Sequence, residues 1–159
     1  KYSLESVLRK GAELVKRKGI KCLVIDPYNK VRDINAASDD VNRYTMDYLS
    51  KIEQFCKKYD VLTFIVAHPT KMYKGQDGKM EEPNMYNIKG GGEWYDASYH
   101  GLLVHRNYEA KNTKVKVLKV KFQNLGENGA ECFFTWEPKS GCYIPEDTNE
   151  QKEQLPWES

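Results

Sequence analysis

Apolar positions near the start of the chain recur at helical spacing and are followed by an uninterrupted apolar run. Between residues 3 and 18 the apolar side chains follow the three- and four-residue spacing of an amphipathic helix: Leu4, Val7, Leu8, Ala12 and Val15. Gly19 comes next, as is typical just after a helix C-terminus. Residues 21–26 are then apolar up to Asp26, and Pro27 stops the run. This pattern predicts a strand buried on both faces, as in a parallel sheet.

The next sixty residues repeat this order of helix and strand. Residues 30–38 are polar and predict a loop, and Ser38-Asp39-Asp40 offers an N-cap and negative charge for a helix start. An apolar stripe then predicts a helix to about Tyr59: Val41, Tyr44, Leu49, Ile52, Phe55 and Cys56. Residues 61–67 predict a second buried strand that stops at His68-Pro69. Strand, helix and strand with short joints predict a βαβ unit with a right-handed crossover.

The second half of the chain has a different pattern. Residues 68–92 are long, polar and rich in Gly, Lys and Met, which is typical of a functional or disordered loop. Short strands with a glycine-containing turn at 124–129 follow, and predict an antiparallel finish: 101–106, 115–122, 131–136 and 143–144. Residues 146–159 are polar and predict a flexible tail.

Composition narrows the classes of function. The chain has 159 residues, enough for one domain, and 25 Lys and Arg against 23 Asp and Glu give a formal net charge of +2. Any nucleic-acid footprint must therefore be local. The four cysteines form no CxxC pair, and Cys22 and Cys56 sit in apolar settings. With no membrane-spanning apolar run and no visible signal peptide, we expect no membrane partner and a reducing, cytoplasmic setting.

Asp26 and His68 follow the two predicted buried strands. The carboxyl ends of neighbouring parallel strands form one crevice, where ligands bind in open α/β sheets. A carboxylate there is a natural ligand for Mg²⁺, which prefers oxygen. Asp26 as a turn cap and His68 as a surface histidine are the alternatives.

Lysines recur in the long polar segment beside glycines. Lys71, Lys74 and Lys89, with the glycines at 90–92, suit a phosphate backbone because glycine lets main-chain N–H groups approach phosphates. A solvated loop is the alternative. The GxxxxGK[ST] spacing of a P-loop is absent from the sequence.

Lys119 and Lys121 lie two residues apart on the alternating segment 115–122, so they point to one face. Lys114 and Lys116 are one residue out of step with them and are not in register. Two like charges on one face suit a bound anion. A solvent-facing edge strand, where lysine blocks aggregation, is the alternative.

Taken in order, four segments resemble the DnaB-type hexameric replicative DNA helicases of the phage primase-helicase and Twinkle-like kind. Leu23–Asn29 resembles their Walker B strand. Phe64–Lys71 resembles the next motif, which ends in a phosphate-sensing residue. Ile88–Arg106 resembles the glycine loop, short helix and strand that follow. Val117–Phe122, a glycine turn and then Trp136 resemble the last motif.

The resemblance implies a fold and a set of roles. The fold is α/β: a RecA-like, mostly parallel sheet flanked by helices, with antiparallel strands at the C-terminal end, and residues 1–145 form part of that motor domain. Asp26 holds the Mg²⁺ of bound ATP or another NTP, and His68 senses its terminal phosphate. Lys71, Lys74, Lys89, Gly90 and Gly91 grip single-stranded DNA. Lys119 and Lys121 reach the triphosphate of a neighbouring subunit in a hexameric ring, and Arg106 and Trp136 hold the nucleotide base.

Two departures from the family pattern bear on activity. The family's finger position holds Lys121 where arginine is usual, and lysine lacks the planar fork of guanidinium. The phosphate-binding loop and the catalytic glutamate are expected upstream of Lys1. We therefore expect the isolated chain neither to bind ATP tightly nor to hydrolyse it. The alternatives are a non-catalytic single-strand-binding module, and a recombinase or clock-type ATPase of the same fold.

Overall fold

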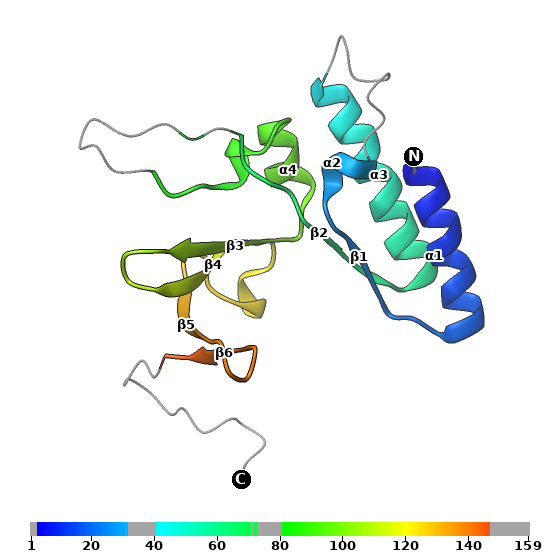
Figure 1. The fold of residues 1–159 in the computed structure, drawn as a ribbon. Coiled ribbons are helices and arrows are strands. Elements are labelled where there is room, and N and C mark those ends of the chain that lie inside the picture. Colours follow the sequence, from blue (N-terminus) through cyan, green and yellow to red (C-terminus); the bar gives the residue numbers. More distant parts are fainter. Residues whose placement is uncertain (1–2, 32–40, 71, 73–80, 147–159) are drawn as a thin grey trace. The chain divides into compact units, whose positions relative to one another are not determined.

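The computed structural model describes residues 3–31, 41–70, 72 and 81–146, which form two compact units (Figure 1). Unit 1 covers Lys1–Tyr99 and unit 2 covers His100–Ser159. The predicted N-cap at residues 38–40, Lys71, Lys74 and the tail from 147 onward lie outside the described residues. No helix in the described part of the chain is long and apolar enough to cross a membrane.

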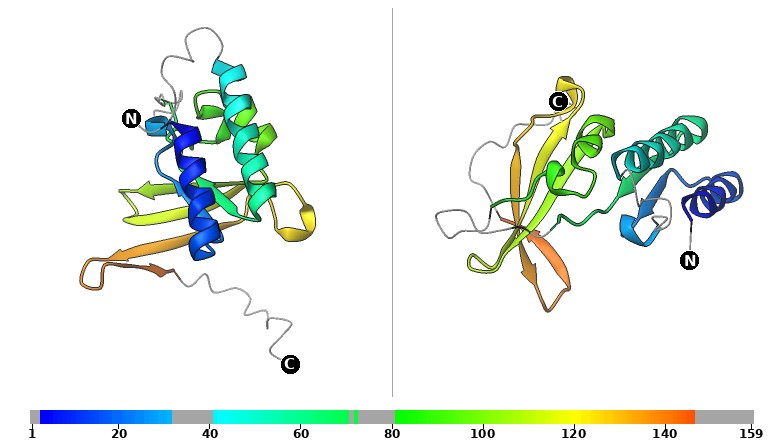
Figure 2. Two further views of the ribbon diagram at one scale, coloured as in Figure 1. Left: turned by 90° about the vertical axis from the view of Figure 1, so that its right-hand side faces the viewer. Right: turned by 90° about the horizontal axis from the view of Figure 1, so that it is seen from above.

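Two amphipathic helices form the larger part of unit 1. Helix α1 (Leu4–Lys18) begins where the side chain of Ser3 accepts a hydrogen bond from the Ser6 amide, and ends at Gly19, which has φ +67°. Helix α3 (Val41–Tyr59) packs against α1, and the two lie side by side in both views of Figure 2. Their closest approach is at Gly11, where an added Cβ would lie 3.0 Å from the Phe55 ring. Both helices are confirmed.

The two strands of unit 1 form a parallel pair, which confirms the βαβ unit. Strand β1 (Cys22–Ile25) pairs with β2 (Leu62–Ile65), with Ile25 opposite Ile65. The short helix α2 (Tyr28–Val31) follows β1 directly. Residues 30 and 31 were predicted as loop and are helical instead, because the Lys30 amide donates to the carbonyl of Pro27 and closes a turn.

The prediction that both strands are buried on both faces is wrong. Residues alternate along them: Leu23 and Ile25 turn inward, and Leu23 packs beside Gly11 of α1. Cys22 and Val24 turn outward on β1, as Leu62 and Phe64 do on β2, and Val24 is 58% exposed. The helices of unit 1 therefore cover one face of this pair. An apolar run does not reveal by itself which of its faces has a covering layer.

A glycine-rich segment and a short helix complete unit 1. The 3₁₀ turn η2 (Met85–Asn87) leads into helix α4 (Gly91–Ala97), which packs against α3 and η2. The order of glycine loop, short helix and strand that the resemblance implied is confirmed, since β3 begins three residues after α4.

Unit 2 is a four-stranded antiparallel sheet in the order β3-β4-β5-β6, which confirms the predicted antiparallel finish. Its elements are β3 (His100–Asn107), β4 (Asn112–Val120), the 3₁₀ turn η3 (Gln123–Leu125), β5 (Glu131–Glu137) and β6 (Cys142–Pro145).

Candidate functional site

Asp26 and His68 follow neighbouring strands at the same end of the parallel pair. Asp26 comes directly after β1, and His68 comes three residues after the end of β2. Both side chains are exposed. The Val66 amide donates to the Ile25 carbonyl over 2.9 Å, and the Tyr28 amide donates to the Val66 carbonyl over 2.8 Å. These bonds tie the turn that carries Asp26 to the segment that leads to His68.

A buried aromatic cluster holds the turn after Asp26 from behind. The Tyr28 ring meets Trp94 edge-on at 4.8 Å and Tyr48 edge-on at 5.1 Å between ring centres. All three side chains are at most 4% exposed. Burial raises the pKa of Tyr48, so its hydroxyl stays neutral. The cluster joins β1, α3 and α4, and it fixes the backbone from which Asp26 projects.

The glycines after Lys89 are held by close packing. Gly90 has φ +93°, and a Cβ there would lie 2.4 Å from the Thr45 hydroxyl oxygen. A Cβ on Gly91 would lie 2.9 Å from the Tyr86 carbonyl oxygen. The Trp94 indole N–H donates to the Lys89 carbonyl over 3.1 Å. The backbone of residues 89–91 is therefore fixed from three sides, while the Lys89 side chain is exposed.

Thr70 connects the strand end to this glycine segment. Its amide donates to the Asn87 carbonyl over 2.7 Å, and its hydroxyl donates to the same oxygen over 2.9 Å. Asn84 closes a capping box around η2 with Asn87. His68, two residues before Thr70, is thus linked through two hydrogen bonds to the turn that precedes Lys89. Of the predicted DNA-binding lysines, Lys89 is described, and Lys71 and Lys74 lie in segments that are not.

In unit 2, a bulge changes the phase of the lysines on β4. Gly101 pairs with Lys119 but Leu102 pairs with Val117, so Leu118 is an extra residue. Paired residues of antiparallel strands share a face, and Leu103 pairs with Lys116. Lys114 and Lys116 therefore lie on the same face as Lys119, and the prediction that they are out of register is wrong. The alternation of the strand also puts Lys121, just past its end, on this face.

Glu131 answers part of this charge. It lies 2.9 Å from the Lys116 nitrogen and 3.5 Å from that of Lys114. The hydrogen bond from Lys116 is the main cause of a lowered pKa of the Glu131 carboxyl.

The two residues assigned to the nucleotide base share the opposite face of that sheet. Arg106 pairs with Thr113, which pairs with Phe134, and Trp136 lies two residues further along β5. The Arg106 guanidinium sits 5.3 Å from the centre of the Tyr108 ring. Trp136 packs against Tyr143 at 5.0 Å and is 38% exposed. The sheet thus carries cationic side chains on one face, and Arg106 with an aromatic pair on the other.

The donor set at Asp26 fits a magnesium ion that is bound to a nucleotide. Among the described residues no group of three or more His, Cys, Asp or Glu side chains could hold a metal ion by itself. One exposed carboxylate at a strand end matches the way Mg²⁺ binds in nucleotide sites, through one or two carboxylates, waters and phosphate oxygens. Asp26 would be its protein ligand.

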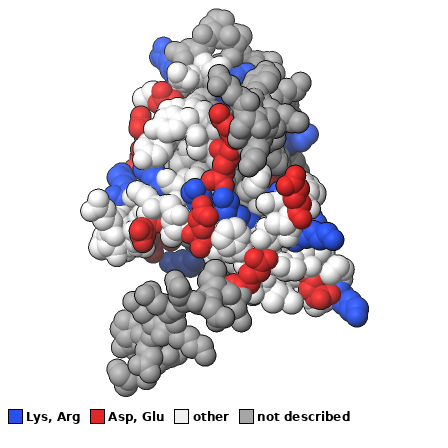
Figure 3. Space-filling view, turned by 90° about the vertical axis from the view of Figure 1, so that its left-hand side faces the viewer, with Lys and Arg blue, Asp and Glu red and all other residues white. Residues whose placement is uncertain are grey.

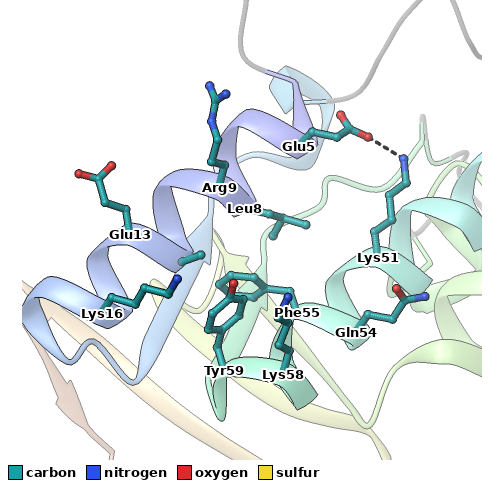
Figure 4. Close-up of a pocket in the computed structure, with 11 residues that line it drawn as sticks. Glu5, Leu8, Arg9, Glu13, Lys16, Lys51, Gln54, Phe55, Lys58 and Tyr59 are labelled. Carbon is teal, nitrogen blue, oxygen red and sulfur yellow. Dashed lines mark hydrogen bonds and ion pairs between the residues drawn. The ribbon is translucent and has the colours of Figure 1, made fainter.

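A groove of about 700 Å³ between α1 and α3 contains none of the predicted site residues (Figure 4). Leu8 and Phe55 line its apolar part, and the Lys51 ammonium lies 2.6 Å from the Glu5 carboxylate at its rim. That hydrogen bond raises the pKa of Lys51 and is the largest cause of the lowered pKa of Glu5. On the face drawn in Figure 3, basic and acidic side chains of the described residues are interspersed. This agrees with a local rather than a broad basic footprint.

Sequence reasoning did not single out three residues that hold the glycine segment: Thr45, Tyr86 and Trp94. Trp94 follows the triple glycine by two positions, and a tryptophan so close to three glycines was a usable signal. Thr45 lies 45 residues before Gly90 in the sequence, and no local pattern connects them.

The comparisons with known proteins agree with the resemblance. No model of a known protein family matches the chain. A Twinkle homolog protein, chloroplastic/mitochondrial, from Arabidopsis thaliana is 28% identical over 146 residues, which are 89% of this chain and 20% of that protein. The solved ATPase domain of a DnaB-like helicase matches with a TM-score of 0.70 at 12% identity, over 90% of this chain and 51% of that one. The chain thus spans a fifth of the curated relative and half of the solved domain. The likeness in sequence and the likeness in fold together identify the chain as a relative of the DnaB-type, Twinkle-like helicases, with the fold of part of a RecA-like ATPase domain.

Proposed function

We propose that this chain supplies the nucleotide-sensing and DNA-gripping part of an ATP-dependent replicative DNA helicase that translocates on single-stranded DNA as a hexameric ring. The observation that carries the proposal is the sequence likeness to the Twinkle homolog along nearly the whole chain. The adjacency of Asp26 and His68 at one end of the parallel pair supports it, since ligands of open α/β sheets bind at that edge.

The roles divide between the two units. In unit 1, Asp26 binds Mg²⁺ of the bound ATP or other NTP, and the metal neutralises charge on the phosphates. His68 contacts the terminal phosphate, and its link through Thr70 and Asn87 to the glycine segment passes the nucleotide state to the DNA-binding residues. Lys89, Gly90 and Gly91, with Lys71 and Lys74, bind the phosphates of a single strand.

In unit 2, Lys119 and Lys121 act on the triphosphate of a neighbouring subunit. Lysine offers a point charge in place of the guanidinium fork, so this contribution to phosphoryl transfer is weaker than that of arginine. Arg106 and Trp136, on the other face of the sheet, hold the nucleotide base.

The purified 159-residue chain allows a direct test. Binding of a fluorescein-labelled oligo-dT, followed by fluorescence anisotropy, should weaken steeply as salt rises, with a slope of about 0.7 per phosphate contacted in a log–log plot. Lys89→Ala should lower that slope by about one phosphate, and Lys10→Ala on α1 serves as its matched control. The chain should not hydrolyse ATP. Absence of oligo-dT binding at 50 mM salt would contradict the proposal, and Mg²⁺-dependent hydrolysis that disappears in Asp26→Ala would refute the predicted inactivity.

A further inference from the structure

Two stacked tyrosines lie beside the glycine segment, and no role described above uses them. Tyr86 of η2 and Tyr95 of α4 have ring centres 5.1 Å apart and ring planes only 19° from parallel. Tyr86 is 58% exposed although one face of its ring lies on Tyr95. An exposed tyrosine held flat by a second ring has lost its side-chain freedom before any ligand arrives.

The surface next to this pair is bare for no internal reason. Gly91 and Gly92 precede Tyr95 by four and three residues, so they share its helix face. Gly91 is crowded by the Tyr86 carbonyl, which explains its lack of a side chain. Gly92 has no positive φ, and an added Cβ would meet nothing within 4 Å. A glycine inside a helix is destabilising relative to alanine, so Gly92 leaves open surface that neither the backbone nor the packing requires.

Charge decides which ligand suits this surface. Lys89 is exposed, and its backbone is anchored by Trp94 in the same short stretch. Glu93 and Asp96 occupy other directions of α4, about 200° and 100° around the helix from Tyr95. A planar aromatic surface, a bare backbone and a neighbouring cation together suit a nucleobase with its phosphate.

We propose that Tyr86, supported by Tyr95, is a stacking platform for one base of a single-stranded DNA, with Gly92 leaving room for the strand and Lys89 facing the phosphate. The inference deepens the proposed function, because it adds base contact to a grip otherwise made on phosphates. Stacking on an aromatic ring is tolerant of sequence, since every base has a π-face. It therefore fits a protein that must move along any sequence.

The experiment compares two ligands that differ only in their bases. Anisotropy titrations of the 159-residue chain use oligo-dT and an abasic oligomer of equal length, which carries the same phosphates. Tyr86→Leu should weaken oligo-dT binding roughly 5- to 150-fold and leave abasic binding unchanged. Tyr86→Phe, which keeps the ring, should bind like the unchanged chain. Gly92→Leu should weaken binding of both oligomers while the helix content stays the same by circular dichroism.

Tyr99→Leu is the matched control, because Tyr99 is a second partly exposed tyrosine close to the end of α4. It should bind both oligomers like the unchanged chain. Oligo-dT binding that is unaffected by Tyr86→Leu overturns the platform and leaves the proposed function standing. Equal losses for both oligomers on Tyr86→Leu also overturn it, since the ring would then act on the backbone. If the unchanged chain binds neither oligomer, the proposed function fails together with this inference.

Discussion

Replacing Gly90 with alanine tests whether the glycine segment is held as described. Gly90 has φ +93°, and its missing Cβ would lie 2.4 Å from the Thr45 hydroxyl oxygen and 3.1 Å from the Thr45 Cβ. Thr45 has no exposed surface and donates its hydroxyl to the Val41 carbonyl, so it has little room to move. The left-handed conformation costs an alanine about 1–2 kcal/mol. Overpacking adds about 1–3 kcal/mol. We expect Gly90→Ala to lower the free energy of unfolding by about 2–5 kcal/mol.

A double-mutant cycle separates the clash from the backbone strain. Thr45→Ala removes the hydroxyl and the methyl group that would meet the new Cβ, and costs about 1–3 kcal/mol by itself. In the double variant the clash is relieved and the strain remains, so the two losses should fall short of additivity by about 1–3 kcal/mol. Urea unfolding followed by tryptophan fluorescence measures all four proteins, since Trp94 is 3% exposed beside this segment.

Gly92→Ala is the matched control for the cycle. It adds the same methyl group two residues along the chain, where nothing lies within 4 Å, and should leave stability unchanged or raise it by up to about 1 kcal/mol. Additivity of Gly90→Ala and Thr45→Ala to within about 0.5 kcal/mol would refute the close packing of Gly90 against Thr45.

Two further predictions concern the packing of α1 on α3. Phe55→Ala should destabilise unit 1 by about 3–5 kcal/mol, because the 5% exposed ring fills the space beside Gly11; a urea midpoint within error of the unchanged chain would contradict this packing. The ion pair of Glu5 and Lys51 should contribute less than about 1 kcal/mol, since both side chains are more than half exposed. The pKa of Glu5 is lowered in the folded chain, so this contribution is present above the ordinary range of a glutamate and is lost as pH falls through the lowered value. Thermal unfolding of Glu5→Gln should therefore differ from the unchanged chain at pH 7 and converge with it at pH 2–3, and a difference that persists in acid would count against the pair.

The elements of the fold that could be predicted from sequence are those that local chemistry specifies. The period of apolar side chains and Gly19 delimit α1, and the order of strand, helix and strand puts Asp26 and His68 at one edge. The exposure of Val24 and Phe64 could not be predicted, because an apolar run does not state which layers cover it. The contact of Thr45 with Gly90 depends on how α3 packs against α4, and no local pattern encodes that. Roles for Asp26, His68 and the unit 2 residues came from resemblance and stay proposals.

The extra residue at Leu118 bears on how this chain is compared with its relatives. Because side chains alternate along a strand, gaining or losing one residue at this point exchanges the two faces for everything that follows on β4. A relative without the bulge could carry lysines at the same alignment columns and present them to the opposite side. Alignments through this strand should therefore be anchored on the pairing of Gly101 with Lys119, and a one-residue gap at Leu118 should be treated as a change of geometry. Lysine content alone is a poor guide to which homologues keep the same cationic face.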